Sequence, residues 1–328
     1  MSMHLSAAIE RFPIAGHFNI ARGSKTEAVV VSVRLDQDGH IGRGECVPYA
    51  RYGETPEDTL AAIEALAPAF AAGMSRAALQ NALPPGAARN ALDCALWDLE
   101  ARRSSTSVAA LASVSLPEKI ETAFTISLGT PDAMAEAAAP AAHLPLLKIK
   151  LGAPGDAERL GAVRAAAPDT RLVVDANEGW HPDDLSVLLD ICAHCRVELV
   201  EQPLPANADQ ALAEIDHPVP ICADESVHAL AGLEALVGRY DAINLKLDKT
   251  GGLTEALAVA ARAEALGLSI MVGCMVSTSL SMLPARLLAA RARWIDLDGP
   301  LLLERDRPNG LNYERGTIAG AASPLWGG

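Results

Sequence analysis

Short apolar runs alternate with alanine- and leucine-rich segments of helical period through most of the chain, from residue 119 onward. Eight such runs end about 25 residues apart, a spacing that accommodates one strand, one helix and two loops. This pattern predicts a parallel sheet whose strands are buried on both faces, and eight strand–helix units close into a barrel. The residues near the ends of the runs are Thr125, Lys150, Asp175, Glu201, Asp224, Lys246, Gly273 and Asp296.

The first 118 residues have a different pattern, which predicts a small α+β unit. β-branched residues fill 27–35, and a turn rich in Asp and Gly leads to a second apolar segment at 41–46. These two segments predict a β-hairpin. The polar segments 21–26 and 48–53 are expected to be loops, and each carries an arginine.

Two helices are predicted in the same unit. The first covers residues 56–72, with Thr55 as the expected N-cap and Pro56 at the first helical position. The second covers residues 86–103, where apolar residues recur at helical spacing. We expect these helices to be structural.

Length and charge narrow the class of protein. The chain has 328 residues, a net charge of −14 and a pI near 5.0, which argues against binding to nucleic acids or acidic membranes. It shows neither a secretory signal nor an apolar stretch of about 18 residues, so we expect a soluble, cytoplasmic protein. The pair Cys192 and Cys195 has no second pair to complete a zinc site, so zinc is a minor alternative. Whether the protein is a homo-oligomer stays open.

Two lysines interrupt the apolar run at 146–151. Lys148 and Lys150 are two residues apart, so in a strand both side chains lie on the same face, about 7 Å apart along the strand. Two neighbouring ammonium groups disfavour each other's charge, and we therefore expect a lowered pKa for at least one of them. An edge strand, from which both lysines reach solvent, is the alternative for this segment taken alone.

Carboxylates end three consecutive predicted strands, at Asp175, Glu201 and Asp224. The carboxyl ends of parallel strands meet at one rim of a barrel, so these groups are expected to converge. Three carboxylates repel one another unless a cation lies between them, and ligands with oxygen alone favour Mg²⁺. Glu178 and Glu225 are second-ranked ligand candidates because they lie beyond the strand ends.

Lys150 and Lys246 are expected on either side of these carboxylates around the barrel. A metal ion with a lysine on each face suits the removal and return of a proton at a carbon next to a carboxylate. The metal offsets the charge of the enediolate, and protonation from the opposite face inverts the carbon. The pattern therefore predicts an enzyme that exchanges a weakly acidic α-proton.

Several segments resemble a known family. LLKIK, VVDAN, LVEQP, CADES and INLKLDKTGG resemble the enolase superfamily, in its branch related to muconate lactonizing enzymes. Longer segments such as GECVPYARYGE and GAARNALDCALWDLEARR are similar to the bacterial L-Ala-D/L-Glu epimerases, the dipeptide epimerases of murein-peptide recycling. The similarity extends over nearly the whole chain and is weakest at 131–145, at 181–196 and near the C-terminus.

The resemblance implies a fold of class α/β, a modified TIM barrel (β/α)7β with an N-terminal α+β capping domain. The implied division is 1–118 for the capping domain, 119–304 for the barrel and 305–328 for a tail that returns to the cap. It also implies that the following residues carry the chemistry: Lys150 and Lys246 as the acid/base pair, Lys148 in support, and Asp175, Glu201 and Asp224 as ligands of one Mg²⁺ per subunit.

Specificity residues are expected at the rim. Asp296 and Asp298 share a strand face, and the resemblance implies that they hold the α-ammonium group of a dipeptide. Arg22 is a candidate partner for a glutamate side-chain carboxylate, with Arg51 a weaker one. Thr125 is a candidate for shaping the pocket, although core packing explains it equally well.

The implied activity is the Mg²⁺-dependent epimerisation of the C-terminal residue of a dipeptide such as L-Ala-D-Glu. The alternatives from the same superfamily are an N-acylamino-acid racemase, an o-succinylbenzoate synthase and a cycloisomerase. A free ammonium group on the substrate suits the acidic pair Asp296 and Asp298 better than an acylated amine does. A barrel that binds a ligand without turnover is the remaining alternative.

Overall fold

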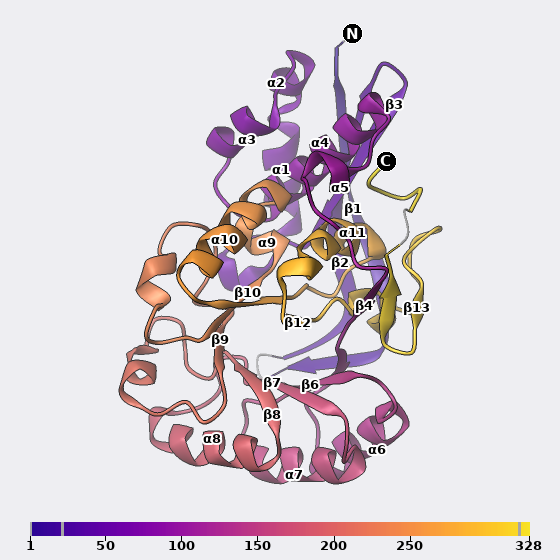
Figure 1. The fold of residues 1–328 in the computed structure, drawn as a ribbon. Helices are drawn as coiled ribbons and strands as arrows, with labels where there is room; N and C mark the ends of the chain where they lie inside the picture. The colour runs from indigo at the N-terminus through magenta and orange to yellow at the C-terminus, as the bar shows by residue number, and fades with distance from the viewer. Residues whose placement is uncertain (1, 21–22, 321–322) are drawn as a thin grey trace.

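The protein is described here by a computed structural model that covers residues 2–20, 23–320 and 323–328. It has an N-terminal cap, a parallel barrel and a C-terminal tail that lies beside the cap (Figure 1). No helix in these three ranges is long and apolar enough to cross a membrane.

The cap is built on an antiparallel sheet. Its strands are β1 (His4–Ile20), β2 (Gly23–Gln37) and β3 (His40–Cys46), paired in that order. The predicted hairpin is confirmed as β2 and β3, and Asp38 and Gly39 in the turn have positive φ angles of 55° and 81°, as tight hairpin turns require.

Two details of the cap sheet differ from the prediction. β1 was not predicted, because Pro13 and Gly16 interrupt its pattern, and the pairing with β2 shifts register between Pro13 and Phe18. The segment 21–26 was expected to be a loop, but β2 already begins at Gly23. β1 and β2 together form a long arm that extends from the cap to the barrel (Figure 1).

The cap helices pack on one face of this sheet. The predicted helix at 56–72 is wrong as a single element, because it breaks before Pro68, whose ring and missing N–H interrupt a helix. Thr55 is confirmed as the N-cap, since its Oγ1 accepts a hydrogen bond of 3.1 Å from the backbone N–H of Asp58. The helices are α1 (Pro56–Glu64), α2 (Ala67–Ala71), α3 (Arg76–Ala82), α4 (Ala87–Ser104) and α5 (Val108–Leu111).

The barrel has eight parallel strands, which confirms the predicted fold class. The sheet closes through a hydrogen bond of 2.8 Å from the backbone N–H of Ala123 to the carbonyl of Ile295. The strands, in the order in which neighbours pair, are β5 (Phe124–Ile126), β6 (Leu146–Lys150), β7 (Arg171–Asp175), β8 (Val197–Glu201), β9 (Ile221–Ala223), β10 (Ala242–Leu245), β11 (Ser269–Val272) and β12 (Trp294–Ile295).

The connections between the strands are less regular than the sequence predicts. Those after β8 and β9 contain only short 3-10 turns, η3 (Gln210–Glu214) and η4 (Leu233–Leu236). Four prolines lie at the two ends of the connection between β8 and β9, and they shorten the segment in which a helix could form. The helices of the barrel are α6 (Pro131–Ala141), α7 (Asp156–Ala166), α8 (Leu185–His194), α9 (Leu247–Thr250), α10 (Leu253–Ala265) and α11 (Ser279–Ala285).

The interior of the barrel has two layers of different character. Side chains alternate along each strand, so every strand contributes one residue to an apolar floor and, two residues later, one position to the layer above it. That upper layer contains Lys148, Asp175, Glu201 and Asn244. The floor is a buried cluster of Ala123, Leu146, Val173, Leu199, Cys222, Ala242, Met271 and Trp294.

Helix α4 attaches the cap to the barrel through buried polar contacts. The carboxylate of Asp248 in α9 accepts hydrogen bonds from Asn90 Nδ2 at 2.8 Å and from the backbone N–H of Val47 at 2.9 Å. Burial raises the pKa of Asp248 to about 7. Arg89 donates to the carbonyl of Thr250 at 2.8 Å, and Asp93 accepts from the backbone N–H of Thr254 at 2.9 Å.

A second buried contact joins the cap, the barrel and the tail. Glu45 of β3 accepts hydrogen bonds from the backbone N–H of Thr278 at 3.0 Å and from Ser281 Oγ at 2.9 Å. Arg307 of the tail donates to the same carboxylate at 2.7 Å. Trp326 Nε1 also donates to the carbonyl of Cys94 in α4 at 3.0 Å, so the tail contacts the cap near Arg307 and again near Trp326.

The tail also forms a small sheet with the segment that leads into the barrel. Strands β13 (Tyr313–Glu314) and β14 (Thr317–Ala319) pair with β4 (Lys119–Glu121). The division of the chain at residues 118 and 304 stays a prediction.

Candidate active site

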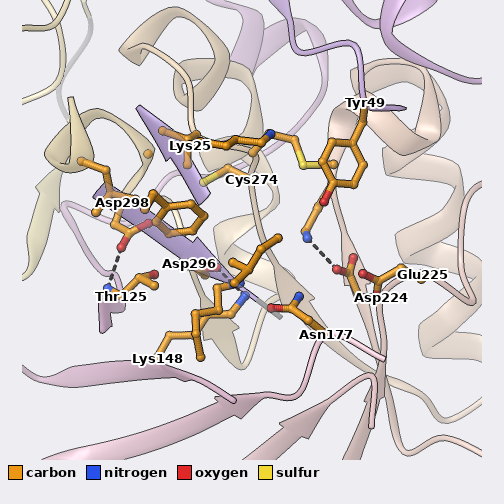
Figure 2. Close-up of a pocket in the computed structure, with 18 of the residues that line it drawn as sticks. Lys25, Tyr49, Thr125, Lys148, Asn177, Asp224, Glu225, Cys274, Asp296 and Asp298 are labelled. Carbon is orange, nitrogen blue, oxygen red and sulfur yellow. Dashed lines mark hydrogen bonds and ion pairs between the residues drawn. The ribbon is translucent and has the colours of Figure 1, made fainter. Parts of the chain in front are cut away.

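A cavity opens at the carboxyl ends of the barrel strands, beneath the arm of the cap. Phe18, Lys25 and Tyr49 line it from the cap, and charged residues of the barrel line it from below. Figure 2 shows Asp224 and Glu225 on one side of this cavity and Thr125, Asp296 and Asp298 on the other. The cavity therefore collects residues from strand ends that are far apart in the sequence.

Lys148 lies at the centre of the charged layer. Its ammonium group is 2.7 Å from Glu201 Oε2, 2.8 Å from Asp296 Oδ2 and 3.2 Å from Asp175 Oδ2, and its side chain is 1% exposed. Strand β6 pairs with neighbours on both sides, so the alternative of an edge strand is wrong. Lys148 is therefore a buried cation that contacts carboxylates at the ends of three strands.

The expected lowering of a lysine pKa is wrong for Lys148. Burial alone lowers the pKa of this ammonium group, but the carboxylates of Asp296, Glu201 and Asp175 outweigh burial and hold the pKa well above its usual value. Sequence reasoning counted the neighbouring ammonium group of Lys150 and left out three carboxylates. The charged layer is thus held together by attraction between unlike charges.

Lys150 and Lys246 lie on opposite sides of the barrel. Lys150 Nζ is 2.6 Å from Asp175 Oδ2, and Lys246 Nζ is 2.7 Å from Asp224 Oδ2. Their strands, β6 and β10, are separated by three others in a sheet of eight, which is half of the barrel. Each lysine therefore approaches the cavity from its own side and has its own carboxylate partner.

Asp175, Glu201 and Asp224 end neighbouring strands and influence one another. Burial and the nearby Asp175 raise the pKa of Glu201 to about 7. Burial also raises the pKa of Asp224, but Lys246 and Lys249 more than reverse this and hold it well below its usual value. The three carboxylates therefore repel one another, and nearby positive charge is needed to keep them ionised.

Two supporting residues were missed by the sequence analysis. Lys249 is buried and lies 2.6 Å from Asp224 Oδ1, and Asn244 Nδ2 donates to Glu201 Oε1 at 2.7 Å. The alternation of strand β10 places Asn244 on the same face as Lys246, so this signal was present. Lys249 lies in the helical turn α9, where strand alternation gives no indication of its direction.

The carboxylate set suits a hard divalent cation. Among the described residues, no three or more His, Cys, Asp or Glu side chains are arranged so that they could hold a metal ion. Ammonium groups lie among the carboxylates instead. The available ligands are nevertheless buried oxygens, and Asn244 and Lys249 hold two of them in place. Asp175, Glu201 and Asp224 therefore fit Mg²⁺ once their lysine contacts rearrange.

Glu178 and Glu225, the second-ranked candidates for metal ligands, lie in different parts of the site. Glu178 forms two hydrogen bonds with Arg51, at 2.9 and 3.0 Å, and accepts another from the backbone N–H of Ala206 at 2.9 Å. Glu225 lines the cavity next to Asp224. These contacts place Glu178 at the rim and leave Glu225 closer to the coupled carboxylates.

An acidic pair forms the far wall of the cavity. Asp298 Oδ2 accepts a hydrogen bond of 2.7 Å from the backbone N–H of Thr125, and burial with the nearby Asp296 raises the pKa of Asp298 to about 7. Asp296 Oδ2 contacts Lys148, while its buried Oδ1 has no hydrogen-bond partner. A cationic ligand here would satisfy that oxygen and relieve the repulsion between the two carboxylates.

The cap contains the two arginines that were predicted to contact the substrate, together with a nearby lysine. Arg22 lies outside the described residues. Arg51 is bound to Glu178 and does not line the cavity, so it joins the cap to the barrel rim. Lys25, which was not singled out, lines the cavity and lies 4.9 Å from the centre of the Tyr49 ring. Lys25 could have been identified from the sequence by its position in the polar segment 21–26.

Comparison with known proteins assigns the family. The model of the mandelate racemase/muconate lactonizing enzyme N-terminal domain matches residues 4–112, and that of the enolase C-terminal domain-like family matches residues 132–323. The chain belongs to the enolase superfamily. The predicted resemblance is thereby confirmed.

Several members of the enolase superfamily are similar along their whole length. The L-Ala-D/L-Glu epimerase of Escherichia coli K12 is 49% identical over 311 residues, which cover 94% of this chain and 97% of that protein. An N-acetyl-D-glutamate racemase of Pseudoalteromonas is 45% identical over 302 residues, covering 92% and 95%.

A solved structure is closer still. An enolase family member from Agrobacterium tumefaciens with homology to dipeptide epimerases, bound to sodium and L-Ala-L-Glu, is 53% identical and superposes with a TM-score of 0.97. The match covers 99% of this chain and 100% of that one. The fold of the cap and barrel is therefore that of this branch of the enolase superfamily.

Proposed function

We propose that the protein is a Mg²⁺-dependent dipeptide epimerase that interconverts L-Ala-D-Glu and L-Ala-L-Glu. The observation that carries this proposal is the placement of Lys150 and Lys246 on opposite sides of the barrel, across three coupled carboxylates. Two bases on opposite faces are what inversion at a carbon requires. The similarity over nearly the whole chain to the L-Ala-D/L-Glu epimerase of Escherichia coli, and to the Agrobacterium tumefaciens protein bound to L-Ala-L-Glu, supports the same proposal.

The residues of the chain divide the reaction between them. One of the two lysines removes the α-proton of the C-terminal residue, and the other delivers a proton to the opposite face. Each lysine must be neutral to act as a base. Asp224 raises the pKa of Lys246, and a cation bound by Asp224 would replace this contact and lower that pKa. Asp175, Glu201 and Asp224 would hold Mg²⁺, which would supply positive charge to offset that of the deprotonated substrate.

The substrate is positioned from two sides. Asp296 and Asp298 hold the α-ammonium group, which meets the unpaired oxygen of Asp296. Lys25 supplies positive charge for a side-chain carboxylate such as that of glutamate, with Arg22 as a further candidate. Residues 1–118 act as the lid, with the tail 305–328 bound to it. A place in murein-peptide recycling in the cytoplasm fits this substrate.

Deuterium exchange tests the proposed function. The protein is incubated in deuterated water with Mg²⁺ and a panel of dipeptides, and proton NMR follows the α-proton of the C-terminal residue. We expect L-Ala-L-Glu and L-Ala-D-Glu to lose this proton and to interconvert. Binding of Mg²⁺ without exchange across the whole panel would favour a barrel that binds without turnover.

A variant of Asp298 tests whether the protein is a dipeptide epimerase or an N-acylamino-acid racemase. One relative is an N-acetyl-D-glutamate racemase. We expect Asp298→Asn to lower kcat/KM for L-Ala-L-Glu by about 10- to 100-fold, because a hydrogen bond to a charged group contributes about 1.5–3 kcal/mol. The neutral substrate group of N-acetylglutamate should be far less sensitive. A wild-type protein that prefers N-acetylglutamate to free dipeptides would favour the racemase.

A further inference from the structure

A second cavity lies directly beside the active site. It has a volume of about 620 Å³ and lies between the arm of the cap, strand β5 and helix α6. Two residues, Thr125 and Leu302, line both this cavity and the catalytic one. Among the described residues, only these two line both cavities, so they lie at the boundary between them.

The second cavity is built for aliphatic groups. Phe124, Met134, Ala137 and Leu144 are among its walls, and none of the described residues that line it is Asp, Glu, Lys or Arg. Its polar lining residues are Asn19, Thr125, Ser127 and His143, so it offers no carboxylate or lysine or arginine cation to the charged ends of a dipeptide. An alkyl side chain entering it would gain free energy by leaving water.

The boundary between the cavities lies next to the place of the substrate's ammonium group. Asp298 is held by the backbone N–H of Thr125, and the short turn η6 (Gly299–Leu302) begins immediately after it and ends at Leu302. The carbon that bears the ammonium group also bears the side chain of the N-terminal residue. With the ammonium group on the acidic pair, that side chain lies within reach of the boundary.

We propose that Leu302 determines the size of the N-terminal residue that the enzyme accepts. Its side chain closes the opening toward the second cavity, so the N-terminal residue must be small, as alanine is. This inference rests on the proposed dipeptide substrate. Thr125 is the fixed side of the opening, because it belongs to strand β5 and its backbone holds Asp298. The side chain of Leu302, by contrast, can be truncated to widen the opening.

Truncation of Leu302 tests this proposal. In Leu302→Ala, the ratio of kcat/KM for L-Leu-L-Glu to that for L-Ala-L-Glu should rise at least about tenfold over the wild-type ratio, since one methylene group in an apolar pocket changes discrimination by about 10- to 200-fold. Leu301→Ala is the matched control. Leu301 belongs to the same turn, is 39% exposed and lines neither cavity, so its variant should keep the wild-type ratio.

The outcomes separate this proposal from the proposed function. A wild-type protein without exchange on any dipeptide contradicts the function itself. A wild-type protein active on L-Ala-L-Glu, with a ratio that is unchanged in Leu302→Ala or equally raised in Leu301→Ala, overturns the role of Leu302. Thermal unfolding checks both variants. If Leu302→Ala does not fold, Leu302→Val provides the same comparison, with a smaller rise expected.

Discussion

Replacing Lys150 or Lys246 by alanine is expected to abolish epimerisation while sparing proton exchange in one stereoisomer. Removing a general base typically costs a factor of about 10² to 10⁴, and inversion needs both bases. The lysines pair with different carboxylates on opposite sides of the barrel, so loss of one leaves the other in place. Exchange in deuterated water, followed by NMR on each stereoisomer, measures both effects.

The pattern of exchange is the decisive result. Lys150→Ala and Lys246→Ala should each retain exchange in a different stereoisomer, and the double variant should retain none. Lys119→Ala, which removes an exposed lysine from β4, is the control and should behave as the wild type. Single variants that retain exchange in the same stereoisomer, or that keep wild-type turnover, would contradict the assignment of one base to each face.

Removal of divalent metal is expected to have an effect of similar size. After treatment with a chelator, exchange should fall below detection, and added Mg²⁺ should restore it, because the three carboxylates otherwise have only lysines to balance them. A measurement without substrate is also available. Binding to the native state alone stabilises it by about 2.7 kcal/mol when Mg²⁺ is at 100 times its Kd, so thermal unfolding should shift upward.

A variant of the central carboxylate tests the same point. Glu201 lies between Asp175 and Asp224 in the order of strands, and Glu201→Gln should lose both the thermal shift and the exchange. Exchange that persists in excess chelator would mean that the carboxylates serve another purpose.

The barrel and its charged residues could be predicted because two simple regularities govern them. Strand alternation places Lys148 and Lys150 on one face, and the parallel arrangement brings Asp175, Glu201 and Asp224 to one rim. Both depend only on spacing along the chain. Spacing also indicated the acidic pair of Asp296 and Asp298, but the shared strand face predicted for them is wrong, because β12 ends at Ile295 and both residues follow it.

The parts that could not be predicted depend on contacts between distant segments. The contact of Lys249 with Asp224 is set by a helical turn, and that of Arg51 with Glu178 joins residues 127 positions apart. The raised pKa of Lys148 follows from carboxylates at the ends of three other strands. Strand β1 was missed for a local reason, because Pro13 and Gly16 break its pattern.

The attachment of α4 to the barrel restricts how a substrate can enter. Rotating the whole cap would break the buried contacts of Asp248, Arg89 and Glu45, and each buried polar group left unpaired costs about 1–3 kcal/mol. The base of the arm formed by β1 and β2 is attached as well, because the backbone N–H of Glu304 donates to the carbonyl of Pro13 at 2.9 Å. Beyond Ile14, a backbone hydrogen bond from Leu128 to Asn19 joins the arm to the barrel. Within the lid, we therefore expect the part of this arm beyond Pro13, where the pairing of the two strands changes register, to move when a substrate enters.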